Sequence, residues 1–266
     1  MKNNSSNFNI IISGVSSGLF EHYIGLLPRS ILDHYQSDNL KYFKSYRHVF
    51  NKMYRDNGIS TFYKLNYPMI LSISFAHIWL FKFYELHKQT KSNYESLFYC
   101  SVSKIGHDIL MIPGDTIRMR NNISGIHSNI IIKDIYNKQN FFGFFKSSPI
   151  TLLMNLPSGL IDFTIIKYCI NNYGNDNHKI FLYGGISGII SSVITNPLDI
   201  IKTNIQIHGI QNKYSNNIIK DNSVSCICKN IISNNGYKGF FRGTMLRSFQ
   251  TSLCFGTYEY ISSKFT

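Results

Sequence analysis

The segment "MIPGDTIRMR", residues 111–120, joins an apolar run to a proline, an acid and two arginines. A proline removes a helical hydrogen bond, and charged groups are unfavourable in apolar surroundings, so the combination is unusual. A second segment of the same form is "TNPLDIIKTNIQ", residues 195–206. The matching residues are Pro113, Asp115 and Arg118 in the first segment and Pro197, Asp199 and Lys202 in the second. The two prolines lie 84 residues apart, which indicates an internal structural repeat.

A third, less regular copy and a second recurring word support this repeat. Pro28, in "GLLPRSILDHYQ", lies 85 residues before Pro113. A glycine-aromatic-basic word follows each copy: "NGISTFYKL" at 57–65, "QNFFGFFKS" at 139–147 and "NGYKGFFRG" at 235–243. Small residues four apart, in "GVSSG" at 14–18 and "GGISG" at 184–188, allow helices to approach closely. We predict three repeats in one domain, at residues 1–90, 91–174 and 175–266.

Composition favours a helical membrane protein. The 266 residues carry a net charge of +13 and 15% aromatic side chains, with a mean hydropathy of -0.09. Six stretches long enough to span a bilayer are mostly apolar but contain isolated polar residues, which in spanning helices normally face a cavity. These stretches are 8–27, 66–86, 95–114, 149–171, 180–198 and 244–263. We predict an all-α protein of six transmembrane helices with short surface helices near 45–57, 128–138 and 222–234; a soluble helical protein is the alternative.

Several other classes of protein lack support in the sequence. There is no nucleophile elbow, phosphate-binding loop or catalytic carboxylate pair, so an enzyme is not expected. The basic residues are scattered rather than striped along one helix, which argues against nucleic acid as a partner. The N-terminus, "MKNNSSNFNI", has the features of neither a cleavable signal nor a transit peptide.

The repeated words resemble the mitochondrial carrier family over almost the whole chain. In that family, a Pro-x-acid-x-x-base word ends each odd helix, and the acid of one repeat pairs with the base of the next to close a matrix-side gate. The resemblance implies a multi-pass, monomeric protein of the mitochondrial inner membrane, without a cofactor and with anionic lipids such as cardiolipin as partners. The implied matrix-gate residues are Pro113, Asp115, Arg118, Pro197, Asp199, Lys202 and Gln206. We expect Asp115 to pair with Lys202.

The first repeat departs from this gate pattern. Counting from Pro28, Ser30 holds the position of the acid and Asp33 that of the base. Sliding the alignment by one residue puts Arg29 at the acid and Leu32 at the base. Either register predicts a broken ring of ion pairs, in which Asp199 has no basic partner from the first repeat.

The even helices of the family carry an aromatic-acid-x-x-base word that forms an opposing gate. This sequence keeps the word fully once and partly a second time, at Tyr84, Glu85, Lys88, Tyr258 and Glu259. Ser262 replaces the second base, and Lys167 stands where the fourth helix should carry an acid. The opposing gate is therefore predicted to be incomplete.

Histidines occupy the middle of the expected helices. His22 and His107 each precede the proline of their repeat by six residues, about 9 Å of helix rise, so the two should reach the same depth. With His77 on a third helix, they offer imidazole nitrogens that suit Fe(II), Zn and Cu. Met154 and Asn155 add weak donors. We predict a transient metal site of these five residues, while polar contacts between helices are the alternative for each histidine.

The words around these histidines resemble the mitoferrin-like, iron-transporting branch of the family. They are Glu21-His22, Ala76-His77, His107-Asp108, Met154-Asn155-Leu156-Pro157 and the non-basic Asn204 after the last gate word. This resemblance implies transport of ferrous iron, or a small iron complex, into the matrix by alternating access. One alternative is a carrier of the same fold for S-adenosylmethionine or a nucleotide-like solute, with Lys104 and Arg247 as candidate cargo-binding cations. Another is a non-transporting scaffold, suggested by the two damaged gates.

Overall fold

A computed structural model describes residues 2–37, 43–63, 66–89, 93–174, 176–210, 213 and 223–265, and this described part is helical, without strands. The long helices are α1 (Lys2–Ser37), α3 (Tyr67–Gln89), α4 (Asn93–Ser124), α6 (Ser148–Tyr173), α7 (Asn177–Gln206) and α9 (Thr244–Phe265). The short helices are α2 (Tyr46–Asn57), α5 (Ser128–Gln139) and α8 (Val224–Asn235). They are followed by the 3-10 turns η1 (Ile59–Tyr63), η2 (Phe141–Phe145) and η3 (Tyr237–Phe241).

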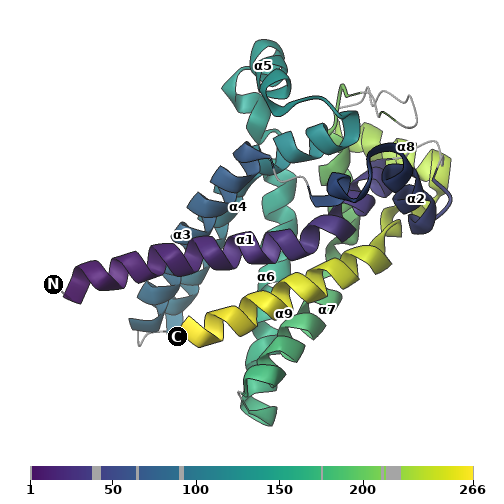
Figure 1. Ribbon diagram of the computed structural model, residues 1–266. Helices are drawn as coiled ribbons and strands as arrows, with labels where there is room; N and C mark the ends of the chain where they lie inside the picture. The colour runs from purple at the N-terminus through teal and green to yellow at the C-terminus, as the bar shows by residue number, and fades with distance from the viewer. Residues whose placement is uncertain are drawn as a thin grey trace.

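The long helices form a closed ring. Each packs against the next in chain order, from α1 to α3, α4, α6, α7 and α9, and α9 packs back against α1. The short helices follow the C-terminal ends of α1, α4 and α7; in Figure 1, α5 lies at the top and α2 and α8 lie at the right. The chain thus repeats one unit: a long helix, a short helix, a 3-10 turn and a second long helix.

The glycine-aromatic-basic words form the 3-10 turns. Gly58, Asn140 and Gly236 begin these words with φ angles of 70°, 56° and 63°. Each backbone N–H returns to a carbonyl of the preceding short helix, on Tyr54, Tyr136 and Ile232 respectively. Glycine, and less often asparagine, tolerates positive φ, so these positions end the short helix and turn the chain.

The prolines of the repeat words lie inside helices rather than at their ends. Pro28, Pro113 and Pro197 fall within α1, α4 and α7, and each of these helices continues for more than two turns beyond its proline. A proline within a helix removes one hydrogen bond and favours a local bend. Arg120, the last residue of the opening segment, caps another helix: its Nε donates to the carbonyl of Gln206 at 2.7 Å, at the end of α7.

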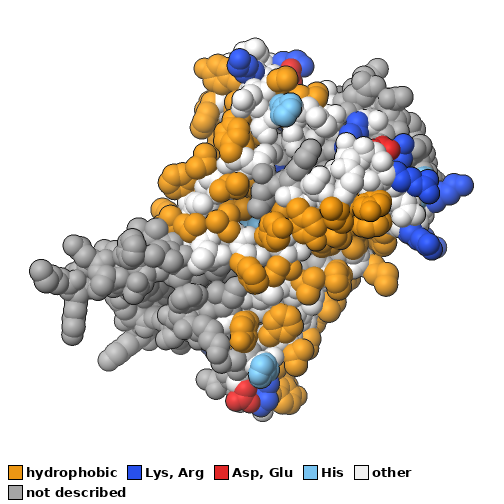
Figure 2. Space-filling model, viewed as in Figure 1, with side chains coloured by type: hydrophobic (Ala, Val, Ile, Leu, Met, Phe, Trp, Pro, Cys, Tyr) orange, Lys and Arg blue, Asp and Glu red, His pale blue; other side chains and the backbone are white. Residues whose placement is uncertain are grey.

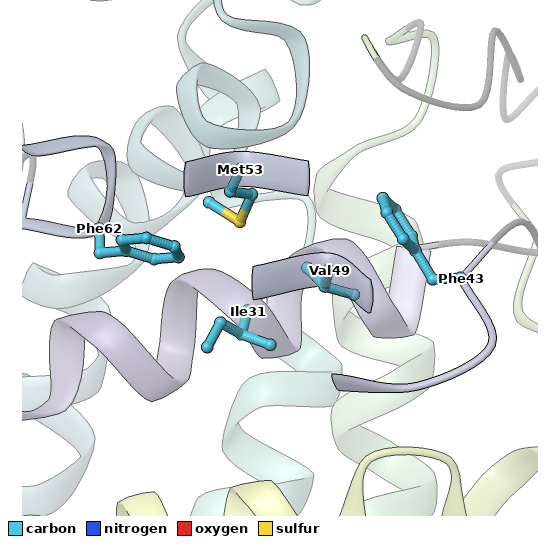
Figure 3. Close-up of a cluster of buried hydrophobic side chains, with 5 residues drawn as sticks. All are labelled: Ile31, Phe43, Val49, Met53 and Phe62. Atoms are coloured by element: carbon cyan, nitrogen blue, oxygen red, sulfur yellow. The ribbon is translucent and has the colours of Figure 1, made fainter. Parts of the chain in front are cut away.

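Each repeat holds its short helix with a separate hydrophobic cluster. In the first repeat, the cluster joins α1, α2 and η1, as Figure 3 shows, and consists of Ile31, Phe43, Val49, Met53 and Phe62. The second consists of Ile117, Ile131, Ile135 and Phe144, and the third of Ile200, Ile201, Ile205, Ile227 and Ile231. The clusters fix the short helices to the ends of the odd long helices, next to the repeat words.

The outer surface is apolar around the middle of the bundle. Large hydrophobic side chains cover much of the face in Figure 2, while Lys and Arg gather near the end that carries the short helices. By length and hydropathy, two stretches of the described residues qualify as membrane spans, Phe141–Tyr173 and His178–Gln206.

Candidate functional site

The ring of long helices encloses a cavity of about 220 Å³. Side chains from all six long helices line it, and those predicted from the sequence are His22, His107, Met154, Asn155, Asp115, Arg118, Asp199, Lys202 and Arg247. Ser191, the counterpart of the two histidines in the third repeat, also lines the cavity. The equal spacing of His22 and His107 from their prolines therefore brings both to the same chamber.

The three histidines lie in a row across three helices. The ring centroids of His22 and His77 are 5.5 Å apart, and those of His77 and His107 are 5.0 Å apart, both with edge-to-face geometry. His77 is buried behind the other two, at the junction of α1 and α3. The three rings are neighbours, but the cavity lining includes only His22 and His107, so the predicted metal site of all three histidines stays a prediction.

Gly18 provides the space for His77. A Cβ atom on Gly18 would lie 2.4 Å from Cγ of the His77 ring, closer than any real contact. The small-residue word at 14–18 thus allows α1 to lie against the imidazole as well as against α3.

We expect the substitution Gly18→Val to push His77 out of its position and to lower the melting temperature. Overpacking a buried contact typically costs about 1–3 kcal/mol. The matched control is Gly159→Ala, because a Cβ atom there would meet nothing closer than 3.9 Å. Thermal unfolding of purified protein in detergent measures both, and equal melting temperatures for the two variants would contradict the assignment.

Neighbouring acceptors fix the orientation of two imidazoles. Nδ1 of His77 lies 3.0 Å from the carbonyl oxygen of Ile73, and Nδ1 of His107 lies 3.1 Å from Oδ1 of Asp108. A carbonyl or carboxylate oxygen only accepts, so Nδ1 carries the proton in both rings, and Nε2 is the basic nitrogen. The same arrangement orients metal-binding histidines in many proteins.

The predicted weak donors are only partly available. The Arg247 Nη2 atom lies 3.6 Å from the sulfur of Met154, and Asn155 is a hydrogen-bonding neighbour of the Asp108 carboxylate. Within the part of the chain that the structure describes, no group of three or more His, Cys, Asp or Glu side chains is arranged to hold a metal ion.

A network of ion pairs closes the cavity at the end near the short helices. Nζ of Lys202 lies 2.8 Å from Oδ2 of Asp115, so the predicted contact between the second and third repeats is present. Nη1 of Arg118 lies 2.7 Å from Oδ2 of Asp33, which joins the first and second repeats.

The prediction that Asp199 has no basic partner in the first repeat is wrong. Nη1 of Arg29 lies 3.7 Å from Oδ1 of Asp199, which joins the third repeat to the first. The ring therefore closes through three inter-repeat pairs. In the first repeat the base comes before the acid, and Nε of Arg29 also contacts Oδ1 of Asp33, four residues later, at 3.0 Å. Aligning the three motifs position by position leaves Arg29 out of register and so predicts a broken ring. The long side chain of Arg29 nevertheless reaches Asp199 and closes the ring.

Amide side chains accompany each pair. Nε2 of Gln206 donates to Asp115 at 3.2 Å, as its inclusion in the gate prediction requires. Nε2 of Gln36 donates to Asp199 at 3.1 Å, and Nδ2 of Asn122 donates to Asp33 at 3.2 Å. Sequence reasoning missed Asn122, although it follows Pro113 at the same distance as Gln206 follows Pro197.

The substitution Asp33→Ala tests the reversed pair. It leaves Arg118 and Arg29 without their shared buried carboxylate, and removing one member of a buried pair typically costs about 3–5 kcal/mol. We therefore expect a large drop in melting temperature, and a smaller one for the double variant Asp33→Ala with Arg118→Ala, which also removes one of the two stranded cations. Additive losses in this double-mutant cycle would contradict a direct interaction.

Arg247 ties α9 to α7. Its Nη1 donates to the carbonyl of Ser192 at 2.6 Å, its Nη2 to Oγ1 of Thr195 at 2.9 Å, and its Nε lies 3.3 Å from Asp199. These contacts occupy the guanidinium that the sequence offered as a cargo-binding cation.

The opposing gate lies largely outside the described side chains. Its predicted residues, Tyr84, Glu85, Lys88, Tyr258 and Glu259, fall on α3 and α9, where the side chains are not described. The incompleteness predicted for this gate therefore stays a prediction.

Comparison with known proteins identifies the architecture. The family described as "Mitochondrial carrier protein" matches three times, at residues 3–95, 89–177 and 175–266. The "Mitochondrial RNA-splicing protein MRS4" of Saccharomyces cerevisiae is 29% identical over 250 residues, which cover 88% of this chain and 82% of that protein. Mitoferrin-1 of Homo sapiens is 22% identical over 274 residues, covering 93% of this chain and 80% of that protein. Because the three matches span nearly the whole sequence and coincide with three copies of one structural unit, the chain belongs to the mitochondrial carrier protein family, whose members are multi-pass transporters of the mitochondrial inner membrane.

Proposed function

We propose that this protein carries ferrous iron, or a small ferrous complex, across the inner membrane into the matrix. The observation that carries the proposal is the pair of histidines at the wall of the cavity, His22 and His107, with the ring of His77 packed against both, in a chain similar to mitoferrin-1. Imidazole nitrogen is a good ligand for Fe(II), and His22 and His107 both border the cavity. Few and weak ligands suit a carrier because the ion has to leave again.

The proposal includes six membrane-spanning helices and alternating access. The ion-pair network among α1, α4 and α7 would form the matrix gate, closed in this conformation, so that the cavity receives cargo from the opposite side. Loaded cargo would then favour rupture of the pairs and opening toward the matrix. Rocking of repeats around a central site is the general way in which transporters of this kind work.

The positive net charge is compatible with a cationic cargo. In the gate network, Asp33, Asp115 and Asp199 balance three of the four basic side chains that contact them. The matrix-negative membrane potential contributes about 2.3 kcal/mol per charge per 100 mV toward cation entry. Much of the remaining positive charge would face anionic lipids at the membrane surface.

We further propose that the protein works as a monomer in contact with anionic lipids such as cardiolipin. The helix ring closes within one chain, which supports the monomer. A second pocket, between the end of α1 and η3, is lined by Lys44, Lys238 and Arg242, which supports contact with a lipid phosphate.

A carrier of the same fold for S-adenosylmethionine or a nucleotide-like solute is the second candidate. Lys104 on the cavity wall favours a nucleotide-like solute, because it offers a cation to an anionic group of the cargo. Arg247 does not offer one, since its guanidinium is bound to α7. The scaffold alternative drew on a broken matrix gate, and the closed ring removes that part of its support.

Uptake by liposomes containing the purified full-length chain tests the proposal. Ferrous iron kept reduced by ascorbate is expected to accumulate inside, faster than in protein-free liposomes, whereas labelled S-adenosylmethionine and ATP are not. Uptake of S-adenosylmethionine or ATP without iron would favour the second candidate. No uptake of any of the three would favour the scaffold.

A further inference from the structure

Arg247 touches both the cargo cavity and the gate. It lies in the first turn of α9, lines the cavity and is 6% exposed. Its Nη2 donates to the sulfur of Met154 on α6 at 3.6 Å, and its Nε lies 3.3 Å from Oδ2 of Asp199 on α7. One guanidinium group therefore joins a predicted cargo donor to an acid of the gate network.

Two further contacts fix the plane of this guanidinium. Its Nη1 donates to the carbonyl oxygen of Ser192 at 2.6 Å, and its Nη2 donates to Oγ1 of Thr195 at 2.9 Å, both on α7. The N–H donors of an arginine are held in one rigid, planar fork. The group therefore cannot move away from Met154 without also changing its contact with Asp199.

Asp199 belongs to the longest ion pair of the gate ring. Its pair with Arg29 spans 3.7 Å, whereas the other two inter-repeat pairs of the described residues measure 2.7 and 2.8 Å. Arg29 contacts Oδ1 of Asp199 and Arg247 contacts Oδ2, so the two arginines share one carboxylate. A closer contact with Arg247 would draw this carboxylate toward α9 and away from Arg29. Arg247 is thus placed to loosen the gate between the third and the first repeat.

We propose that Arg247 is a positioning residue that transmits the binding of a cationic cargo to the matrix gate. A metal ion at the thioether of Met154 repels the guanidinium, because like charges interact strongly at short distance in a low-dielectric cavity. The guanidinium then moves off the sulfur and onto Asp199, which lengthens the pair between Asp199 and Arg29. This rests on the proposed function, because an anionic cargo would instead attract Arg247 into the cavity and away from Asp199.

The substitutions Arg247→Gln and Arg247→Lys separate the charge of this residue from its two-sided contact. Glutamine can still donate to α7 but no longer repels the cargo or draws Asp199 from Arg29. We therefore expect KM for ferrous iron to fall about three- to tenfold and Vmax to fall about tenfold. Lysine keeps the charge, but one ammonium group cannot contact Met154 and Asp199 together, so KM should stay near wild type while Vmax falls. Lys133→Met, which removes an exposed positive charge on α5, is the matched control.

Initial rates of ferrous-iron uptake at equal protein per liposome give KM and Vmax, and melting temperatures in detergent report folding. A fall of both constants in Arg247→Gln, with KM near wild type in Arg247→Lys, would support the inference. A lower Vmax at an unchanged KM in Arg247→Gln would show that Arg247 only holds α9 to α7. A lower KM at an unchanged Vmax would show that it repels cargo without acting on the gate. Either of these last two results would overturn the inference.

A higher KM in Arg247→Gln would also overturn it, because Arg247 would then bind the cargo itself. If the glutamine variant does not fold, Arg247→Met removes the same charge and is judged by the same criteria. Wild-type liposomes that take up no ferrous iron would overturn the proposed function, and this result is distinguishable because it appears without any substitution.

Discussion

The substitution Asp115→Ala is expected to reduce ferrous-iron uptake by about 100-fold or more. Asp115 accepts from Nζ of Lys202 at 2.8 Å, from Nη2 of Arg118 at 3.0 Å and from Nε2 of Gln206 at 3.2 Å. Its removal leaves two buried cations without their shared carboxylate, and stranding a buried charge typically costs about 3–5 kcal/mol. The matrix-closed conformation would then be poorly populated, so that cargo could not be received from the other side.

The partner test for this variant is the neutral double substitution Asp115→Ala with Lys202→Ala. We expect the double variant to transport better than Asp115→Ala alone, because one of the stranded charges is gone. A charge swap is less clean, since a lysine at position 115 would lie beside Arg118. Uptake at the wild-type rate by Asp115→Ala, measured at equal protein per liposome, would remove the gate role.

The substitutions His22→Ala and His107→Ala are each expected to lower ferrous-iron uptake at least tenfold. Each substitution removes an imidazole that borders the cavity. Loss of even an outer-shell partner of a metal ligand commonly lowers metal affinity about 10- to 100-fold, so loss of a ligand should lower it at least as much. The measured quantity is the initial rate of uptake at a fixed, low iron concentration. His127→Ala is the matched control, because His127 is exposed and its side chain makes no capping hydrogen bond to α5.

The histidine variants also distinguish transport from packing. His77 is buried between His22 and His107, so its removal should lower both the melting temperature and the rate of uptake. Loss of His22, which is less buried, should lower uptake with little effect on melting. Normal uptake by both His22→Ala and His107→Ala would show that the histidines serve helix packing, and the assignment of a metal cargo would lose its physical basis.

Only part of the gate could be predicted from the sequence. Asp115 and Lys202 could be paired in advance because their two words match residue for residue. Arg29 and Asp33 could not, because their order in the first repeat is reversed. Contact between charged groups depends on where side-chain ends meet, and an arginine reaches several ångströms from its own Cα.

The location of the proposed metal site was predictable from the sequence, but the packing of its side chains was not. Equal spacing from the prolines brought His22 and His107 to one cavity. Their neighbours followed from three-dimensional packing: Gly18 admits the ring of His77, and Arg247 lies against the sulfur of Met154.

The sequence by itself determined the repeat, the family resemblance and the helical plan, because periodic words and apolar stretches are local properties that survive without knowledge of packing. It also determined the candidate side chains for cargo binding and gating, the histidines and the gate charges. The tertiary structure decided which of these side chains meet: that the first repeat closes the ring with reversed polarity, and that Arg247 is bound to α7. Contacts of this kind depend on helix rotation and side-chain reach, which only the assembled bundle fixes.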